Sequence, residues 1–194
     1  VYILFLRPNG FVDDHVKILG NTPLFTAIDG GVEKRDYFGS SLAAADLNGD
    51  GINDLLVGAP TDDVIERDQG SVWAMFLDAT GTPTTVSRIS AAEGVANLDR
   101  GDEFGTSVAN LGDVNSDGVP DIAVGAIGDD NDNNDAGAIH AFFMNAEATI
   151  ATQNEISGTE GNFHGILDRK DQFGISIAAS GDLDGDCITE VMVG

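Results

Sequence analysis

A segment of 66 to 69 residues repeats along this chain, and this repeat most constrains the fold. A pattern that begins at Phe38 returns at Phe104 and again at Phe173, and an Asp stands two residues before each Phe. The copies read Phe38-Gly39-Ser40-Ser41, Phe104-Gly105-Thr106-Ser107 and Phe173-Gly174-Ile175-Ser176, after Asp36, Asp102 and Asp171. Because a fixed period of this length is typical of repeat architectures, we expect similar units that stack on one another.

Each copy continues with an acidic loop and then with short apolar segments. In the first two copies, these segments lie at 55–60 and 122–127, and aromatic-rich runs follow at 72–77 and 139–144. With the Phe-Gly segment before them and a further strand expected near 86–90 and its equivalents, each unit has four short strands. Short strands separated by frequent turns are typical of all-β folds. Four such strands in one unit match the blade of a β-propeller, whereas a β-sandwich gives no reason for side-chain identity at a constant offset. We therefore predict an all-β propeller of four-stranded blades.

The strand pattern divides the chain into three blade equivalents. Residues 38–91 and 104–158 supply complete blades, while 1–19 and 173–194 supply half a blade each. Since propellers close with about four to eight blades, we expect a partial propeller, which is an open arc or a fragment of a larger ring. Nearest-neighbour contacts stabilise repeats, so an arc can still fold. We also expect that residue 1 is not the start of the protein, because it begins an apolar run typical of an interior strand.

Three acidic loops offer oxygen ligands at alternate positions. Positions 1, 3, 5 and 9 carry side-chain oxygens, and the backbone carbonyl of position 7 can join them. The candidate ligands are Asp46, Asn48, Asp50, Ile52 and Asp54; Asp113, Asn115, Asp117, Val119 and Asp121; and Asp182, Asp184, Asp186, Ile188 and Glu190. Ca²⁺ accepts about six to eight hard oxygen ligands at irregular geometry, so these loops suit it better than Mg²⁺ or a metal that prefers nitrogen and sulfur.

Only the first half of each loop resembles an EF-hand. An EF-hand needs a bidentate Glu at position 12, where this chain has Val57, Val124 and Val193. The last carboxylate stands at position 9 instead, directly before an apolar segment. We therefore predict a calcium loop within a β-hairpin.

On these motifs the sequence resembles the FG-GAP repeat family, the blades of the integrin α-subunit propeller and of many bacterial secreted proteins. Phe38-Gly39 and Gly58-Ala59-Pro60 spell the family name, with an acidic loop between them. The resemblance covers essentially the whole chain, although Ile127 stands where the second copy would have Pro. It implies Ca²⁺ at the loop positions given above and a fragment of a seven-bladed ring.

The third loop departs from the family pattern at two positions. Cys187 replaces a Gly at a position where a left-handed backbone is expected, and Glu190 replaces the last Asp. A side chain in that conformation costs about 1 kcal/mol, so we expect two calcium sites and a third, weaker one. The alternative for all three loops is a solvated acidic turn that holds no ion, although clustered carboxylates repel one another without a cation.

The charge balance narrows the classes of partner. The chain has 33 Asp and Glu against 9 Lys and Arg, a formal net charge of −24. Since phosphates are bound by clustered Lys and Arg, we expect no nucleic-acid or anionic-membrane partner. No apolar run is long enough to span a membrane. A salt-adapted acidic surface would also explain the charge.

The remaining candidate features are better explained by structural roles than by catalysis or ligand binding. No Ser-His-Asp arrangement repeats and no glycine-rich phosphate loop occurs, so we predict no enzyme activity within this chain. His140 stands one repeat after Trp73, and we read it as a strand residue and not a ligand. We read the strand aromatics (Tyr2, Phe5, Trp73, Phe76, Phe142, Phe143) as core packing between blades. The acidic cluster Asp129, Asp130, Asp132 and Asp135, like its equivalents Asp62, Asp63 and Asp68, is read as a solvated turn.

Two classes of function fit these features. The favoured class is a non-enzymatic, calcium-binding module of a secreted or cell-surface protein, which serves adhesion, recognition or scaffolding through protein or glycan ligands. The alternative is the propeller platform of a larger extracellular enzyme that acts on polysaccharide or lipid. Extracellular calcium modules bind at about 10⁻⁴–10⁻³ M, so occupied loops imply a calcium-rich medium.

Overall fold

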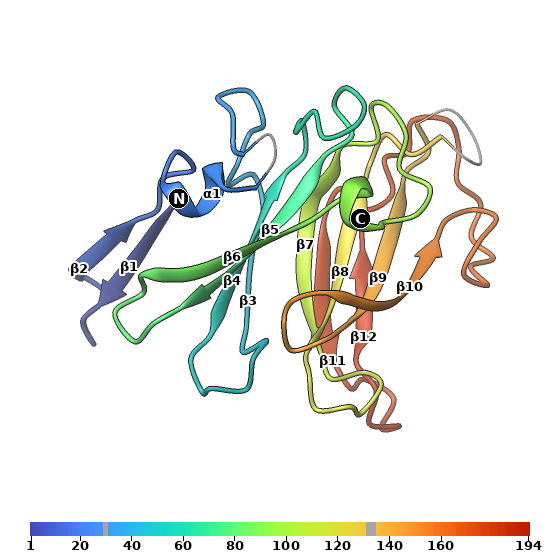
Figure 1. The fold of residues 1–194 in the computed structure, drawn as a ribbon. Coiled ribbons are helices and arrows are strands. Elements are labelled where there is room, and N and C mark those ends of the chain that lie inside the picture. Colours follow the sequence, from blue (N-terminus) through green and yellow to red (C-terminus); the bar gives the residue numbers. More distant parts are fainter. Residues whose placement is uncertain (29–30, 131–134) are drawn as a thin grey trace.

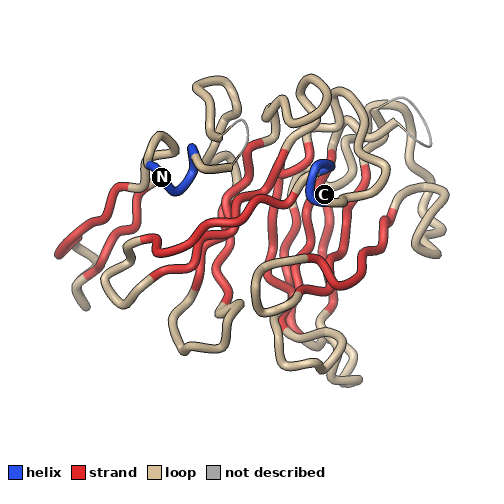
Figure 2. The backbone as a smooth tube through the Cα atoms, in the orientation of Figure 1, coloured by secondary structure: helices blue, strands red, loops and turns tan. Residues whose placement is uncertain are grey.

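The chain forms a row of antiparallel β-sheets with almost no helix (Figures 1 and 2). The computed structural model describes residues 1–28, 31–130 and 135–194. Its strands are β1 (Tyr2–Leu6), β2 (Val12–Lys17), β3 (Leu42–Ala45), β4 (Asp54–Ala59), β5 (Ser71–Leu77), β6 (Pro83–Ile89), β7 (Phe104–Gly112), β8 (Asp121–Ala126), β9 (Ala138–Met144), β10 (Ile150–Ile156), β11 (Ile177–Gly181) and β12 (Glu190–Val193). One helical turn, α1 (Pro23–Thr26), and one 3₁₀ turn (Ala91–Glu93) complete the described elements.

The strands are arranged as two complete meanders and two hairpins. β3-β4-β5-β6 and β7-β8-β9-β10 are four-stranded sheets, and β1-β2 and β11-β12 are two-stranded sheets. The first strands of successive sheets lie beside each other, since β7 contacts both β3 and β11. The predicted all-β, partial propeller of four-stranded units is therefore confirmed, and its described sheets form an open arc (Figure 1).

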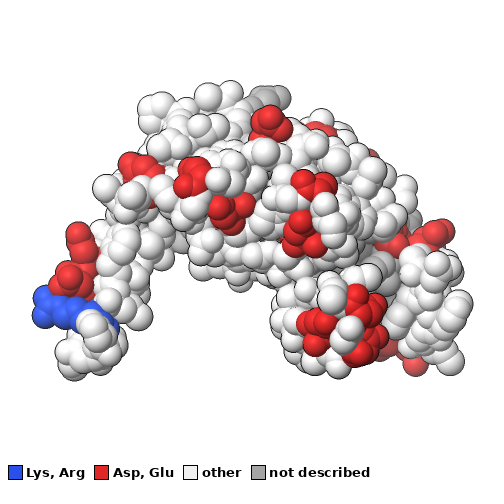
Figure 3. All heavy atoms as spheres, turned by 90° about the horizontal axis from the view of Figure 1, so that it is seen from below, with Lys and Arg blue, Asp and Glu red and all other residues white. Residues whose placement is uncertain are grey.

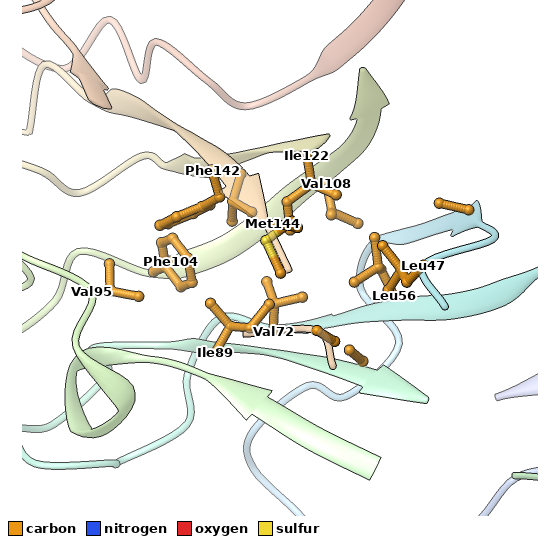
Figure 4. Packing of buried hydrophobic residues seen from close by; sticks show 14 of the residues in the cluster. Leu47, Leu56, Val72, Ile89, Val95, Phe104, Val108, Ile122, Phe142 and Met144 are labelled. Carbon is orange, nitrogen blue, oxygen red and sulfur yellow. The ribbon is translucent and has the colours of Figure 1, made fainter. Parts of the chain in front are cut away.

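Apolar side chains on both faces of each complete sheet build the core. Successive residues of a strand point to opposite faces, so Val72 and Trp73 of β5 enter different clusters. Val72 packs with Phe104 and Phe142 of the next sheet (Figure 4), whereas Trp73 packs with Phe25 on the side of the β1-β2 hairpin. Burial on both faces explains why β4, β5, β8 and β9 are nearly continuous apolar runs.

The repeated Phe-Gly and Gly-Ala motifs form the junction between neighbouring sheets. The Ser41 hydroxyl donates to the Gly105 carbonyl at 2.7 Å, and a Cβ on Gly58 would lie 2.0 Å from the same oxygen. One repeat later, the Ser107 hydroxyl donates to the Gly174 carbonyl at 2.6 Å, and a Cβ on Gly125 would lie 2.1 Å from that oxygen. Glycine is therefore required where one backbone passes closest to the next.

Two details differ from the sequence-based expectation. The Phe-Gly pair lies within a strand only in β7, while Phe38 and Phe173 come before β3 and β11. Phe104 pairs with Ala126 of β8 and also forms a parallel bridge with Gly70, the residue directly before β5. Core packing is correct for Trp73 and Phe142, which are buried, and wrong for Tyr2 and Phe5, which are 54% and 37% exposed and lie on opposite faces of β1. No helix among the described residues is long and apolar enough to cross a membrane.

Candidate metal centre

The three acidic loops join the first two strands of successive sheets. They connect β3 to β4, β7 to β8 and β11 to β12, and all three lie at the same end of the sheets, at the bottom of Figure 1. The repeat therefore places three equivalent candidate sites side by side on one face of the arc.

Backbone N–H groups hold the carboxylates of the first loop in a compact turn. Asp46 accepts from the N–H groups of Asp50 at 3.1 Å and Gly51 at 2.9 Å, and Asp50 accepts from that of Ile52 at 2.8 Å. The Asn48 amide donates to the Asp50 carboxylate at 3.0 Å. The hydrogen bonds of the loop alone therefore bring the side-chain oxygens of positions 1, 3 and 5 to one turn.

The second loop repeats this scaffold bond for bond. Asp113 accepts from the N–H groups of Asp117 and Gly118, both at 2.9 Å, and Asp117 accepts from that of Val119 at 2.9 Å. The Asn115 amide donates to Asp117 at 2.8 Å. The sequence repeat is therefore also a repeat of local hydrogen bonding.

The last carboxylate of these two loops ties the loop to the sheet. Asp54 accepts from the N–H of Leu47 at 3.0 Å and from that of Leu77, on β5, at 3.1 Å. Asp121 accepts in the same way from Val114 at 2.9 Å and from Met144, on β9, at 3.1 Å. Burial raises the pKa of both carboxyl groups, and these backbone hydrogen bonds oppose that shift. Each buried Asp therefore fixes the position of its loop.

The third loop brings four carboxylates together. One oxygen each from Asp182, Asp184, Asp186 and Glu190 lies within 4.8 Å of the others, the one such group of metal-binding side chains within residues 1–28, 31–130 and 135–194. Glu190 accepts from the N–H of Leu183, as Asp54 does from Leu47. In the first two loops an Asn occupies position 3, so fewer carboxylates gather there.

The turn requires a left-handed backbone at position 6. Gly51 has φ 86° and Gly118 has φ 93°, and Cys187 adopts φ 70° at the equivalent position. The strained side chain expected at Cys187 is therefore present. The exposed Cys187 donates its N–H to Asp182 at 3.0 Å, so the loop keeps the same turn.

The donor set fits a hard divalent cation. Carboxylate and amide oxygens in this number are the ligands that Ca²⁺ takes, and each carboxylate oxygen that accepts an N–H keeps a second lone pair for a metal. The N–H groups of Ile52, Val119 and Ile188 donate to the position-5 Asp of their loops. Three points stay predictions: that the backbone carbonyls of position 7 bind the ion, that the ion is Ca²⁺, and that the third loop binds it more weakly than the first two.

Sequence reasoning gave no role to the Asp that precedes each Phe-Gly pair. Asp36 and Asp102 are buried, and burial raises the pKa of Asp36 to about 6 and that of Asp102 to about 7. Nearby Asp62 and Asp129 add to these shifts. Their fixed spacing from the motif was the available signal.

The interpretation of the hairpin tips as solvated turns is partly wrong. Asp62 and Asp129 are 5% and 2% exposed and lie near Asp36 and Asp102, which precede the Phe-Gly pairs of the same units, whereas Asp63 and Asp130 are exposed. Asp62 accepts from the Ser71 hydroxyl at 2.6 Å. Asp132 lies outside the described residues.

The face that carries the loops is acidic. Figure 3 views the molecule from this side and shows carboxylates in several clusters, with basic side chains visible only at one end of the arc. In the β1-β2 hairpin, Arg7 pairs with Asp13 at 2.6 Å. Cations are therefore the favoured partners of this face.

Comparison with known proteins agrees with this architecture. The FG-GAP repeat family matches residues 38–75 and 104–142. The chain is 35% identical over 162 residues to integrin alpha-2 of Mus musculus and 33% identical over 174 residues to integrin alpha-4 of Xenopus laevis. These matches cover 81% and 89% of the chain but only 13% and 15% of those relatives. The chain thus belongs with the FG-GAP repeat proteins, as its sequence motifs predict.

Proposed function

We propose that this chain is a calcium-binding, non-enzymatic FG-GAP module of a secreted or cell-surface protein, which serves adhesion, recognition or scaffolding. Each acidic loop binds one Ca²⁺, and the ion completes a turn whose carboxylates otherwise repel one another. The observation that carries the proposal is the convergence of four carboxylates in the third loop, on the same backbone scaffold as the first two loops.

Relatives support the extracellular part of this proposal. The chain resembles integrin alpha chains of several animals over most of its own length, including integrin alpha-7 of Homo sapiens at 34% identity. Protein or glycan ligands would contact the loops of the arc. Because the chain spans less than a fifth of those relatives, its place in an adhesion protein is part of the proposal.

A calcium titration followed by thermal melting tests the metal assignment. With a dissociation constant of about 10⁻⁴–10⁻³ M, 10 mM Ca²⁺ stabilises the fold by about 1.4–2.7 kcal/mol per site. For a chain of this length, that raises Tm by about 3 °C or more per site relative to a sample in EDTA. Native mass spectrometry counts the bound ions, with three expected. An unchanged Tm would overturn the assignment.

A matched pair of double variants locates the ions. Asp50→Asn with Asp117→Asn removes two loop charges and abolishes most of the calcium-dependent rise in Tm. Asp63→Asn with Asp130→Asn removes two equally exposed charges from the hairpin tips and leaves that rise unchanged. If the second pair reduces the rise more than the first, the ions are bound elsewhere.

A further inference from the structure

The two complete blades differ in charge at one equivalent place. Residues 67 positions apart correspond, so His140, Glu155 and Glu160 stand where the first blade has Trp73, Arg88 and Glu93. The strand registers agree, because Trp73 faces Arg88 across β5 and β6, and His140 faces Glu155 across β9 and β10. A basic side chain in one blade is therefore an acidic side chain in the next.

In the first blade, the Arg88 guanidinium occupies this place. It lies 5.8 Å from the centroid of the Trp73 ring and pairs with Glu93 at 3.1 Å. Ser90 donates its hydroxyl to the same Glu93 carboxylate. The Arg88 side chain is only 5% exposed, so its charge is held between an aromatic ring and a carboxylate, away from water.

In the second blade, the corresponding place is a cavity of about 580 Å³. His140, Glu155 and Glu160 line it, and none of the described lining residues is Lys or Arg. One wall is fixed, because Gln153 accepts from the N–H of Ala96 at 3.0 Å and donates to the Gly94 carbonyl at 2.8 Å. The residues that line the cavity come from β9, β10, the loop that follows the 3₁₀ turn and the segment after β10.

Two buried polar atoms at this cavity have no hydrogen-bond partner in the described structure. They are Nε2 of His140, a residue that is 2% exposed, and Oε1 of Glu155. The other Glu155 oxygen accepts from the Asn97 amide at 3.0 Å. Burial lowers the pKa of His140 to about 4, so its imidazole is neutral at pH 7 and can accept an N–H. Unpaired buried atoms are costly, which favours a ligand that donates to both.

We propose that this cavity binds the guanidinium group of a ligand, in the place that Arg88 fills in the preceding blade. A guanidinium is planar and carries five N–H donors, so it can donate to His140 and Glu155, while Glu160 adds a second carboxylate. A metal ion fits less well, because the described residues around the cavity bring no three metal-binding side-chain atoms together. His140 is then a ligand-binding residue as well as a strand residue, and the site is separate from the calcium loops.

Binding of agmatine, followed through the imidazole NMR signals of His140, tests the proposal. Agmatine shifts the His140 signals saturably, and N-carbamoylputrescine, in which a neutral urea replaces the guanidinium, does not. Glu155→Gln weakens agmatine binding at least tenfold. Glu147→Gln removes the same charge from an exposed position between β9 and β10 and leaves binding unchanged. Equal effects of the two variants would overturn the proposal.

A second variant supplies the cation from within the chain. Glu155→Arg restores the residue of the first blade, so it abolishes agmatine binding and preserves or raises Tm. N-acetylarginine amide distinguishes the two sources of the group, because it binds more tightly than agmatine if the natural ligand is a peptide side chain. Absence of any His140 shift with either compound, or a shift produced by Ca²⁺ instead, would show that the cavity is not a guanidinium site.

Discussion

The junctions between sheets and the acidic loops are built from the same repeat but depend on different physics. At the junction end, Gly58 lies against the Gly105 carbonyl and Phe104 is completely buried, so contacts are dry and close. At the loop end, the Asp46 carboxylate accepts from two backbone N–H groups and that of Asp50 from one, and Asp50 is exposed to solvent. The junction needs only its own atoms, whereas the loop gathers negative charge that a cation would neutralise.

The difference teaches which part of the repeat supplies the fold and which part supplies a site. Burial of apolar surface and backbone hydrogen bonds at the junctions stabilise the arc whether or not an ion is bound. Asp54 and Asp121 anchor the loops to the sheets, because each joins its loop to the buried third strand of its sheet. Changes at the junction should therefore act in any buffer, and changes in the loops should act through calcium.

The largest effect is expected from a side chain at the junction. Gly58→Ala places a Cβ 2.0 Å from the Gly105 carbonyl oxygen, so one sheet must move away from the next. We expect a loss of about 3 kcal/mol or more and a fall in Tm of about 6 °C or more, equal in calcium and in EDTA.

A matched glycine variant in the loop provides the control. Gly49→Ala also adds one methyl group, but nothing lies within 4 Å of it, and only its φ of 73° is unfavourable. It should cost about 1 kcal/mol. Equal losses from the two variants would contradict the close contact at the junction.

The second largest effect is expected from the buried Asp54, whose loss should cost more stability in EDTA than the loss of the exposed Asp50. Asp54→Ala leaves the N–H groups of Leu47 and Leu77 without their acceptor, so it should cost about 2 kcal/mol even in EDTA. Asp50→Ala removes an exposed side chain, and its cost should appear only when calcium is present. Urea unfolding with and without EDTA measures both. A cost for Asp50→Ala in EDTA as large as that for Asp54→Ala would contradict the distinction.

The sequence predicts the repeated local motifs well, but it does not predict the contacts between segments that are distant in the chain. The copies at Phe38, Phe104 and Phe173 predict four-stranded units and equivalent loops, because each motif is local and repeats at a constant spacing. Asp102 lies near Asp129 in the hairpin of its own unit, and one wall of the cavity at His140 depends on the hydrogen bond from Ala96 to Gln153, 57 residues later. Contacts of this kind join residues far apart in sequence, so the local pattern does not reveal them. A comparison of Arg88 with Glu155 along the repeat would have revealed the reversed charge.

A smaller effect is expected at Asp102, the buried residue just before the Phe-Gly pair of β7, where stability should depend on pH. The pKa of Asp102 is raised to about 7 in the folded chain by burial, against a usual value near 3.8, so the folded state binds a proton more tightly than the unfolded state. The contribution of Asp102 is therefore fully stabilising below about pH 4 and is lost as the pH rises towards 7. In EDTA, Tm should rise by a few degrees from pH 7.5 to pH 5.5.

Asp102→Asn tests the origin of this slope. The amide can still accept from the N–H of Asp99, as the carboxylate does at 2.6 Å, but it does not titrate. The rise in Tm on acidification should become smaller in this variant. Glu147→Gln, at an exposed position between β9 and β10, should leave the slope unchanged. A slope that Asp102→Asn does not alter would place the pH response elsewhere.

The smallest effect concerns the third loop. Cys187 has a φ of 70°, which a glycine adopts without strain. Cys187→Gly should therefore remove about 1 kcal/mol of backbone strain, and the greater conformational freedom of glycine in the unfolded chain offsets part of that gain. If the strain also weakens calcium binding, the variant should bind its third ion several-fold more tightly in a calorimetric titration. Cys187→Ser keeps a side chain at this φ and serves as the control. Tighter binding in both variants would assign the effect to the thiol instead of the backbone, and the loop would then differ from the first two in chemistry and not in strain.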